Sequence, residues 1–359
     1  MWGQLVWLKR TTQLKNSLEI ENVSIGVVGA GSWGTAIADL LGTKGFKVNL
    51  WAYETEVVEA IRTKRENPLY LKGHTLSDHI RATNDIQDAV SDRDLVVVVI
   101  PSHYVRVVSQ KFADALSKKT ILVSASKGIE NHTRLTMTGV LSETVQSVTE
   151  ERLAVLSGPS FAKEVAQKIP TAVTVASKNP ETAGFVQHVF ATPLFRVYTS
   201  DDVMGAEMGG AVKNVIAIAA GIIDGLGLGL NARAALITRG IAEISRLGIK
   251  LGANPLTFSG LAGIGDLILT CTGDLSRNYT VGTLIGKGKS IEDILSKMRM
   301  VAEGVKTAKS VYNLSRNLGV DMPICQETYH ILYEGLSPRK ALQRLMTRDL
   351  KNERDEMNH

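Results

Sequence analysis

A glycine pattern near the start of the chain constrains the fold more than any other feature of the sequence. It reads Val27-Val-Gly29-Ala-Gly31-Ser-Trp-Gly34, and it follows an apolar run and opens a helical pattern. In such a pattern the first glycine permits a tight turn, the second lets the backbone approach a pyrophosphate, and the third lets helix and strand pack closely. The following helix N-terminus offers N–H groups and positive partial charge to an anion. This context predicts a dinucleotide site, which the bare glycine spacing alone would not.

Short apolar runs recur through the first two thirds of the chain and predict a parallel sheet. Several are continuous Val/Ile/Leu runs, as at residues 95–100, which is typical of strands that helices cover on both faces. Because helical patterns alternate with them, we predict an α/β, doubly wound Rossmann-type sheet domain. The candidate strands are residues 24–29, 47–52, 95–100, 120–125, 153–157, 171–176 and 195–198.

The pattern changes near residue 200, where strand candidates give way to long helical stretches. We expect a mostly α-helical second domain, with helices at 207–226, 232–247, 291–300, 304–318 and 324–333. Cap-type residues at 199–202 predict the hinge before the first of these helices. The expected organisation is an N-terminal extension (1–21), a dinucleotide-binding domain (22–200), a helical substrate domain (201–350) and a polar tail (351–359).

Composition excludes several classes of protein. The net charge of +5, from 41 basic and 36 acidic residues, suits small anionic ligands such as phosphates but lacks the clustered Lys/Arg of a nucleic-acid binder. The cysteines, Cys271 and Cys325, are too few for a disulfide framework, so a reducing cytoplasm is expected. The histidines show no metal-ligand spacing, and we expect no metal. The longest apolar run, 215–230, is interrupted by Asp224 and glycines, so no membrane span is expected.

One lysine stands inside an apolar helical stretch and is the candidate for proton chemistry. Lys213 lies within Gly209-Gly-Ala-Val-Lys213-Asn214, and Asp266 lies in another apolar, glycine-bounded segment. Burial lowers the pKa of a lysine, and an amine tuned in this way can exchange the proton of a secondary alcohol while hydride moves. An Asp–Lys pair would hold the amine in place. The same spacing also suits a lysine that reaches solvent or forms a structural ion pair.

Further polar groups stand where ligands of an α/β domain bind. Ser276-Arg277-Asn278, at a predicted helix start, forms a plausible phosphate cradle, although an ordinary N-cap gives the same pattern. Lys127 follows a strand beside a glycine and is placed for a phosphate or a substrate oxygen. The segment after the second strand holds Tyr53 and Glu54, with Arg62 and Arg65 beyond, and it does not decide between NAD and NADP.

Taken in order, these blocks resemble one family: the NAD(P)-dependent glycerol-3-phosphate dehydrogenases in their bacterial form. The resemblance spans about residues 22 to 345. The residues that carry it are Gly29-Ala-Gly-Ser-Trp-Gly-Thr-Ala36, Pro101-Ser-His103, Ser126-Lys-Gly128, Ser157-Gly-Pro-Ser-Phe-Ala-Lys-Glu164, Gly209-Gly-Ala-Val-Lys-Asn-Val215, Asn231-Ala-Arg233, Gly263-Ile-Gly-Asp-Leu267, Ser276-Arg-Asn278 and Val301-Ala-Glu-Gly304.

The resemblance implies reversible hydride transfer between NAD(P)H and dihydroxyacetone phosphate, which gives sn-glycerol 3-phosphate for glycerophospholipid synthesis. It also implies a cytoplasmic homodimer and Lys213 as the catalytic proton acceptor and donor. NADPH-linked reduction is slightly favoured, but Tyr53 stands where the family often has Arg or His. The implied substrate-binding residues are Lys127, Gly158, Ser160, Asp266, Ser276, Arg277 and Asn278. The implied cofactor-binding residues are Gly29, Gly31, Ser32, Trp33, Gly34, Tyr53, Lys127, Ala162, Arg277, Val301 and Glu303.

Two other functions fit parts of the sequence. A hydroxy-acid dehydrogenase of the 3-hydroxyisobutyrate or 6-phosphogluconate type shares the glycine turn and a catalytic Lys followed by Asn, but the Ser276-Arg-Asn278 block argues against it. A non-catalytic dinucleotide sensor has no need of a buried Lys and Asp. A substrate panel separates the first alternative, and tight cofactor binding without turnover would identify the second.

Overall fold

The computed structural model describes residues 23–298, 302–350 and 352–353, and it contains one eight-stranded sheet with the order β3-β2-β1-β4-β5-β6-β7-β8. Neighbouring strands are parallel from β3 through β6, β7 is antiparallel to β6, and β8 is parallel to β7. This order places the turn after β1 beside β4, where the winding direction of the sheet reverses. The strands are β1 (Ile25–Val28), β2 (Val48–Trp51), β3 (Ile80–Thr83), β4 (Leu95–Val98), β5 (Ile121–Ser124), β6 (Leu153–Ser157), β7 (Thr171–Ala176) and β8 (Phe195–Ser200).

Helices bury both faces of this sheet, and strand β4 shows why its sequence is apolar throughout. Leu95 and Val97 pack into one apolar cluster with α2, α3, α7 and α8, whereas Val96 and Val98 pack into another with α4, α5 and α6. Alternate side chains of a strand point to opposite faces, so each must be apolar when both faces are covered. These helices are α2 (Ser32–Thr43), α3 (Thr55–Lys64), α4 (Ile86–Val90), α5 (Val105–Phe112), α6 (Met137–Thr144), α7 (Ala162–Ala166) and α8 (Pro180–Phe190).

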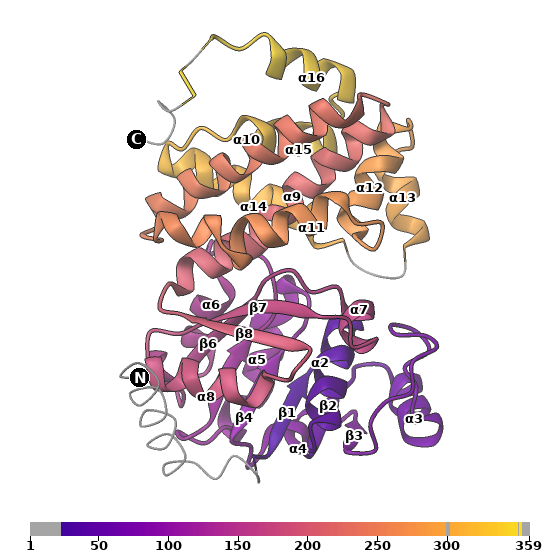
Figure 1. Cartoon of the computed structure of the whole chain (residues 1–359), viewed down its shortest axis with the longest axis vertical. Helices are drawn as coiled ribbons and strands as arrows, with labels where there is room; N and C mark the ends of the chain where they lie inside the picture. The colour runs from indigo at the N-terminus through magenta and orange to yellow at the C-terminus, as the bar shows by residue number, and fades with distance from the viewer. Residues whose placement is uncertain (1–22, 299–301, 351, 354–359) are drawn as a thin grey trace, which may run out of the picture.

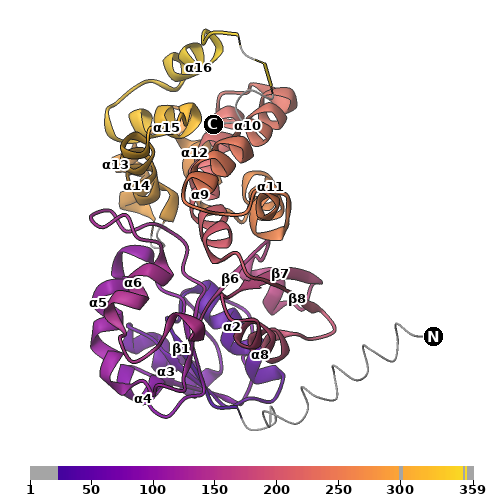
Figure 2. The same cartoon turned by 90° about the vertical axis from the view of Figure 1, so that its left-hand side faces the viewer.

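The rest of the described chain is helical and stacks above the sheet in Figure 1, around a central helix, α9 (Val203–Gly225). Within the described residues, α9 is the helix long and apolar enough to cross a membrane, but its apolar window is wholly buried by neighbours, as in the core of a globular domain. Its N-terminal part meets the sheet layer, which Figure 2 shows from the side. The others are α10 (Gly229–Lys250), α11 (Asp266–Thr272), α12 (Arg277–Gly286), α13 (Ile291–Lys297), α14 (Glu303–Leu318), α15 (Pro323–Tyr333) and α16 (Pro338–Met346).

The predicted fold class is confirmed, with local corrections. Strand β3, with the sequence Ile80-Arg-Ala-Thr83, was not predicted from the sequence; it is a short strand at the sheet edge with an exposed Arg81. Helix α9 begins at Val203 rather than at 207, because the Asp202 side chain accepts a hydrogen bond from the Gly205 amide and caps the helix. The extension 1–21, the last residues of the tail, Val301 and the predicted helix end at 299–300 lie outside the described residues.

Candidate active site

The glycine turn after β1 has the geometry that its sequence predicts. Gly29 has φ +119°, and a Cβ there would lie 2.4 Å from the Val99 carbonyl oxygen. A Cβ on Gly34 would lie 1.9 Å from the Gly29 carbonyl oxygen, so no larger residue fits between helix α2 and the turn. A Cβ on Gly31 would instead meet nothing within 4 Å. The space in front of Gly31 is therefore open to a ligand.

Helix α2 begins at this open space and presents its N-terminus to it. Gly31 is the N-cap, and no side-chain cap is present at this helix start, so the N–H groups of the first turn face the opening uncovered by a side chain. Ser32 and Trp33 form that first turn and are partly buried. An uncapped N-terminus with room beside it fits a pyrophosphate, and these residues therefore fit a dinucleotide cofactor.

The chemical centre of the site is an ion-pair cluster between the sheet and helix α9. Lys213 Nζ donates to Asp266 Oδ1 at 2.5 Å, and Lys127 Nζ donates to Asp266 Oδ2 at 2.7 Å. Thr270, one turn after Asp266 on α11, accepts from Lys213 at 2.8 Å. Lys213 and Asp266 retain 6% and 1% of their accessible surface. Lys213 therefore does not reach solvent, and it shares its carboxylate partner, Asp266, with a second ammonium group, that of Lys127.

Burial and charge act in opposite directions in this cluster. Burial lowers the pKa of Lys213 from 10.5 to about 7, because the nearby Asp266 carboxylate only partly offsets the cost of desolvating the ammonium group. Burial alone raises the pKa of Asp266, but the two ammonium groups outweigh it and lower that pKa below its usual value. The carboxylate therefore stays charged while the amine titrates near neutrality. This arrangement suits a proton acceptor that must also act as a donor.

The carboxyl ends of β4, β5 and β6 form the opposite wall of the site. Lys127 follows β5, and a Cβ on Gly210 of α9 would lie 3.7 Å from the Lys127 side chain and 2.9 Å from Ser157 Oγ at the end of β6. The turn after β6 continues beside Asp266, since a Cβ on Gly265 would lie 3.7 Å from Pro159. Helix α9 therefore approaches the sheet at the edge where ligands of such folds bind.

The first turn of α12 brings the predicted phosphate cradle to the same region. Ser276 is the N-cap of α12, and its Oγ accepts from the Tyr279 amide at 3.3 Å, so the N-cap reading holds for this residue. Asn278 Nδ2 donates to Asn214 Oδ1, next to Lys213, and Asn278 Oδ1 accepts from the Gly304 amide, both at 2.9 Å. Arg277 is exposed as a residue, but the protein around its guanidinium desolvates that group.

Glu303 connects the start of α14 with the sheet. Ser102, just after β4, donates to Glu303 Oε2 at 2.8 Å, and burial raises the pKa of Glu303. The protein around Arg277 lowers the pKa of that guanidinium by desolvation, and the Glu303 carboxylate opposes this effect. Electrostatic attraction therefore couples Arg277, at the start of α12, to Glu303, at the start of α14.

The remaining predicted positions differ in how they lie. Ser160 donates to the Gly158 carbonyl at 3.0 Å, and Ala162 begins α7 and packs partly buried against the sheet core. Tyr53 is 79% exposed after β2, whereas the neighbouring Glu54 accepts from the Tyr70 hydroxyl at 2.6 Å.

Sequence reasoning gave no role to Thr270 and Asn214, because hydroxyl and amide groups are common in helices. Both were visible only as polar residues in apolar helical segments. The contacts that reveal their roles join positions 57 and 64 residues apart.

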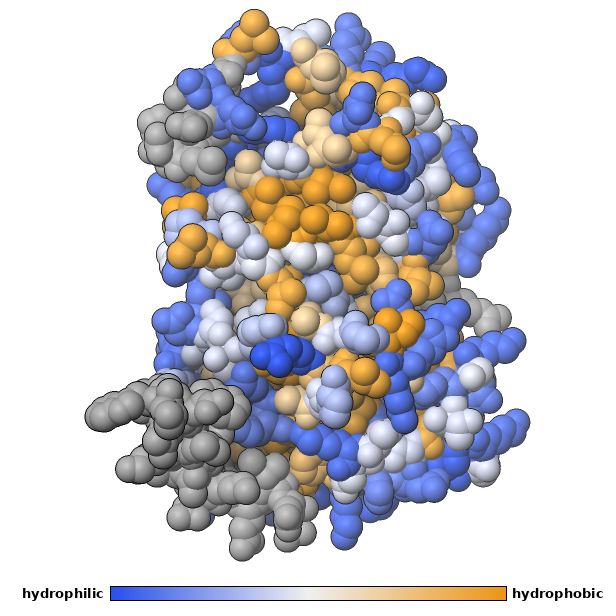
Figure 3. All heavy atoms as spheres, viewed as in Figure 1, coloured by the Kyte–Doolittle hydropathy of each residue, from blue (hydrophilic) through white to orange (hydrophobic). Residues whose placement is uncertain are grey.

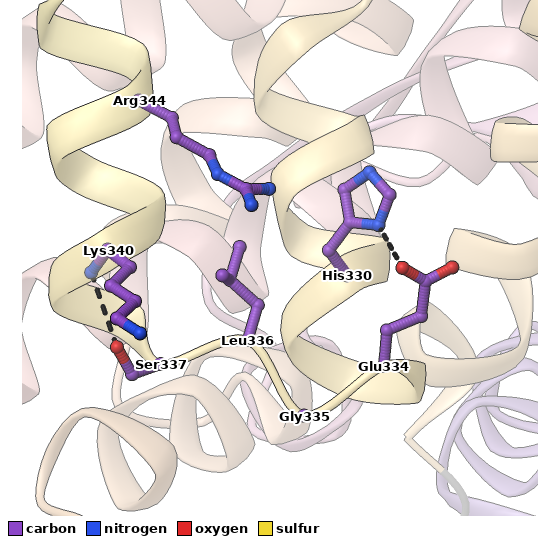
Figure 4. Close-up of a pocket in the computed structure, with 7 residues that line it drawn as sticks. All are labelled: His330, Glu334, Gly335, Leu336, Ser337, Lys340 and Arg344. Atoms are coloured by element: carbon purple, nitrogen blue, oxygen red, sulfur yellow. Dashed lines mark hydrogen bonds and ion pairs between the residues drawn. The ribbon is translucent and has the colours of Figure 1, made fainter.

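Two hollows on the helical layer lie away from this cluster. The pocket in Figure 4 is bordered by His330 of α15 and Glu334 just after it, whose side chains pair at 2.7 Å, and by Lys340 and Arg344 of α16. A groove of about 430 Å³ lies between α10, α15 and α16 and is lined largely by apolar side chains. Neither hollow includes a residue of the Lys213 cluster.

Comparison with known proteins covers nearly the whole chain. The family description "NAD-dependent glycerol-3-phosphate dehydrogenase N-terminus" matches residues 24–183, and "NAD-dependent glycerol-3-phosphate dehydrogenase C-terminus" matches residues 202–343. The glycerol-3-phosphate dehydrogenase (NAD(P)+) of Syntrophobacter fumaroxidans is 56% identical over 329 residues, which is 92% of this chain and 97% of that protein. That of Geobacter sulfurreducens is 55% identical over 330 residues, 92% of this chain and 98% of that protein.

A solved structure agrees with these sequence matches. The crystal structure of a glycerol-3-phosphate dehydrogenase from Coxiella burnetii superposes with a TM-score of 0.87 at 38% identity, covering 91% of this chain and 99% of that one. The similarity therefore extends through both the sheet layer and the helical layer.

Proposed function

The chain belongs to the NAD-dependent glycerol-3-phosphate dehydrogenase family, and from that premise we propose that its Lys213 cluster interconverts dihydroxyacetone phosphate and sn-glycerol 3-phosphate with NAD or NADP. The observation that supports this role is the buried Lys213–Asp266 pair, with an amine whose pKa lies near 7, joined by Lys127 from the carboxyl end of β5. The fold alone would not indicate the reaction, since proteins with related folds catalyse many different reactions.

In the oxidative direction, Lys213 accepts the proton of the C2 hydroxyl, and in the reductive direction it returns that proton to the C2 oxygen. A nicotinamide held at the glycine turn would supply the hydride chemistry at C2. Asp266 stays charged, holds the Lys213 ammonium in place at 2.5 Å and orients it through the fixed α11 backbone. Lys127 neutralises the other carboxylate oxygen and is placed to donate to a substrate oxygen.

The phosphate end of the substrate is assigned to the start of α12. Arg277, an exposed residue at this turn, supplies a guanidinium, a group that binds phosphate through paired hydrogen bonds. Asn278 still has a second amide hydrogen after its bond to Asn214, and it is buried at the helix N-terminus, where the dipole favours an anion. Gly158, Ser160 and the Ser276 backbone complete the proposed substrate-binding set.

The cofactor is assigned to the turn at Gly29, Gly31 and Gly34, with Ser32 and Trp33 in the first turn of α2. Tyr53 and the neighbouring Glu54 are assigned to the ribose position after β2, and Ala162, Arg277 and Glu303 are assigned to the nicotinamide half. Val301, which the sequence assigns to the same half, lies outside the described residues. The open space at Gly31 supports this assignment. The division into a dinucleotide-binding domain (22–200) and a substrate domain (201–350) follows the same logic, because the two ligands would meet between them.

We infer that the physiological product is glycerol phosphate for phospholipid synthesis in the cytoplasm. Two unpaired, buried thiols, Cys271 and Cys325, are consistent with a reducing compartment. A cell depleted of the enzyme should need added glycerol or glycerol phosphate for growth. Growth without such a supplement would argue against this role.

We also propose a homodimer that buries the groove between α10, α15 and α16. Met346, which is 77% exposed, and the fully exposed Leu350 line this groove, and Figure 3 shows apolar residues gathered on the helical layer. The rim carries both charges, including Arg239 and Asp349, which suits a self-complementary two-fold contact. Light scattering should give a dimer for the wild type and a monomer for the double variant Met346→Asp, Leu350→Asp. A wild-type monomer would contradict the proposal.

The decisive experiment follows the oxidation of NAD(P)H by its loss of absorbance, with dihydroxyacetone phosphate as the substrate. The rates with NADH and with NADPH are compared. Turnover with this substrate and none with 3-hydroxyisobutyrate or 6-phosphogluconate is the expected result. Turnover only with a hydroxy acid would assign the related dehydrogenase activity instead. Cofactor binding without any turnover would indicate a sensor.

A further inference from the structure

Helices α9 and α12 approach so closely that their backbones touch. A Cβ on Gly221 of α9 would lie 2.1 Å from the Tyr279 carbonyl oxygen, and a Cβ on Gly282 of α12 would lie 2.0 Å from the Ile218 carbonyl oxygen. The contact repeats one turn later between Gly225 and Gly286. Two glycines spaced four residues apart in each helix let the helices pack in one register. The glycine contact therefore determines how far α12 stands from α9.

A polar cluster closes the side of this contact. The Tyr279 hydroxyl donates to Asp224 Oδ2 near the end of α9, and Arg233 Nη1 of α10 donates to the same oxygen at 2.7 Å. The Asp224 side chain is 19% exposed and that of Arg233 is 24% exposed, so the pair is largely shielded from solvent. Asp224 thereby ties the first turn of α12 to both α9 and α10.

This cluster is joined, through Tyr279, to the same turn of α12 that carries the proposed phosphate-binding side chains. Tyr279 follows Arg277 and Asn278 in the first turn of α12, and Asn278 contacts Asn214, next to Lys213. Helix α9 thus carries both the reacting amine and the carboxylate that anchors α12. Any rotation of α12 about its axis would move Arg277 and Asn278 relative to Lys213.

We propose that Asp224, Tyr279 and Arg233 are positioning residues that fix the rotation of α12 about its axis, and with it the place of its phosphate-binding turn relative to the Lys213 amine. They act through Arg277 and Asn278, and the proposal rests on the proposed function of those two residues. Because Lys213 has its own anchors in Asp266 and Thr270, loosening α12 should weaken substrate binding more than turnover.

The test is Tyr279→Phe in the full-length enzyme, which removes only the hydroxyl that reaches Asp224. We expect the KM for dihydroxyacetone phosphate to rise about tenfold, because a charge-assisted hydrogen bond is lost and the cradle loses its position. Saturated turnover should stay within about twofold of the wild type, and the KM for the cofactor should not change. Inorganic phosphate, tested as a competitive inhibitor, should bind more weakly by the same factor as the substrate.

A matched control is Tyr312→Phe, which removes a hydroxyl that accepts from Arg316 on the outer side of α14. This variant should keep the wild-type KM. Asp224→Asn retains an acceptor for the Tyr279 hydroxyl, so its KM should rise less than that of Asp224→Ala. If these residues only stabilised the fold, their variants would have a lower thermal midpoint and a smaller active fraction, but an unchanged KM.

Arg277→Ala separates this proposal from the one on which it rests. If Arg277→Ala raises the KM and weakens phosphate inhibition while Tyr279→Phe leaves both unchanged, the positioning role is wrong and the cradle stands. If Arg277→Ala also leaves both unchanged, the phosphate assignment itself is wrong. An equal KM increase in Tyr312→Phe would overturn the positioning role as well.

Discussion

Replacing Lys213 by alanine tests the chemical centre of the protein most directly. The change removes the ammonium group that donates to Asp266 Oδ1, but Lys127 still donates to Oδ2 of the same carboxylate at 2.7 Å. The buried Asp266 therefore keeps a cationic partner, and the fold should survive. The expected loss is one of proton transfer rather than of structure.

The size of the loss follows from the burial of this amine. A pKa lowered from 10.5 to about 7 corresponds to about 5 kcal/mol against the charged form. At pH 7 roughly half of the amine is neutral, compared with about one molecule in three thousand for an ordinary exposed lysine. Removing a base so well matched to neutral pH should reduce turnover by about 10²–10⁴-fold.

The same pKa gives the two directions opposite pH dependences. Oxidation of glycerol phosphate needs the neutral amine as acceptor, so its rate should rise with pH and level off above about 7. Reduction needs the charged amine as donor, so its rate should fall as the pH rises through about 7. Lys213→Ala should lose this inflection in both directions.

The assay measures turnover with dihydroxyacetone phosphate, with NAD(P)H affinity measured separately by fluorescence titration. Lys250→Ala, at the exposed end of α10, is the control for loss of a lysine and should behave as the wild type. Cofactor affinity should be nearly unchanged in Lys213→Ala. A Lys213→Ala enzyme with close to full turnover would refute the role given to this amine.

Three other substitutions test separate parts of the structure. Asp266→Asn removes the charge that raises the pKa of Lys213, so the pH limit of reduction should move below 7 in a turnover profile. Gly31→Ala adds a methyl group in open space, so the thermal midpoint should hold while the Kd of NAD(P)H rises about tenfold. Burial raises the pKa of Glu243 from 4.5 to about 7; its contribution to stability is therefore full below pH 4.5 and lost as pH rises through about 7. Glu243→Gln should flatten that part of the pH dependence of thermal unfolding. Three results would contradict this reasoning: an unshifted pH profile in Asp266→Asn, an unchanged Kd of NAD(P)H in Gly31→Ala, or a pH dependence of unfolding in Glu243→Gln equal to that of the wild type.

Much of the sheet was predictable because strands that are buried on both faces consist of apolar residues throughout. A strand such as β4 is covered on both faces, so it is a continuous apolar run. Strand β3 lacks this signal because it is an edge strand of four residues whose Arg81 is exposed. The antiparallel placement of β7 against β6 also leaves no mark in either strand, since pairing direction depends on the path of the connection.

The active centre was predictable in part, because charges within apolar segments stand out. Lys213 and Asp266 were found by that signal, and the structure pairs them at 2.5 Å. Thr270 carries no comparable signal, since a threonine in a helix commonly bonds to its own backbone, as this one also does to the Asp266 carbonyl. Its second bond, to Lys213, appears only when α9 and α11 pack together.

The sequence by itself determined the glycine turn, the alternation of strands and helices, and the presence of charged groups where apolar residues surround them. These properties are local, because backbone sterics and side-chain periodicity act over a few residues. The tertiary structure alone decided that Lys127 and Lys213 share one carboxylate, and that the amine of Lys213 titrates near neutrality. Desolvation and charge pairing depend on segments distant in the chain, and only their packing brings those segments into contact.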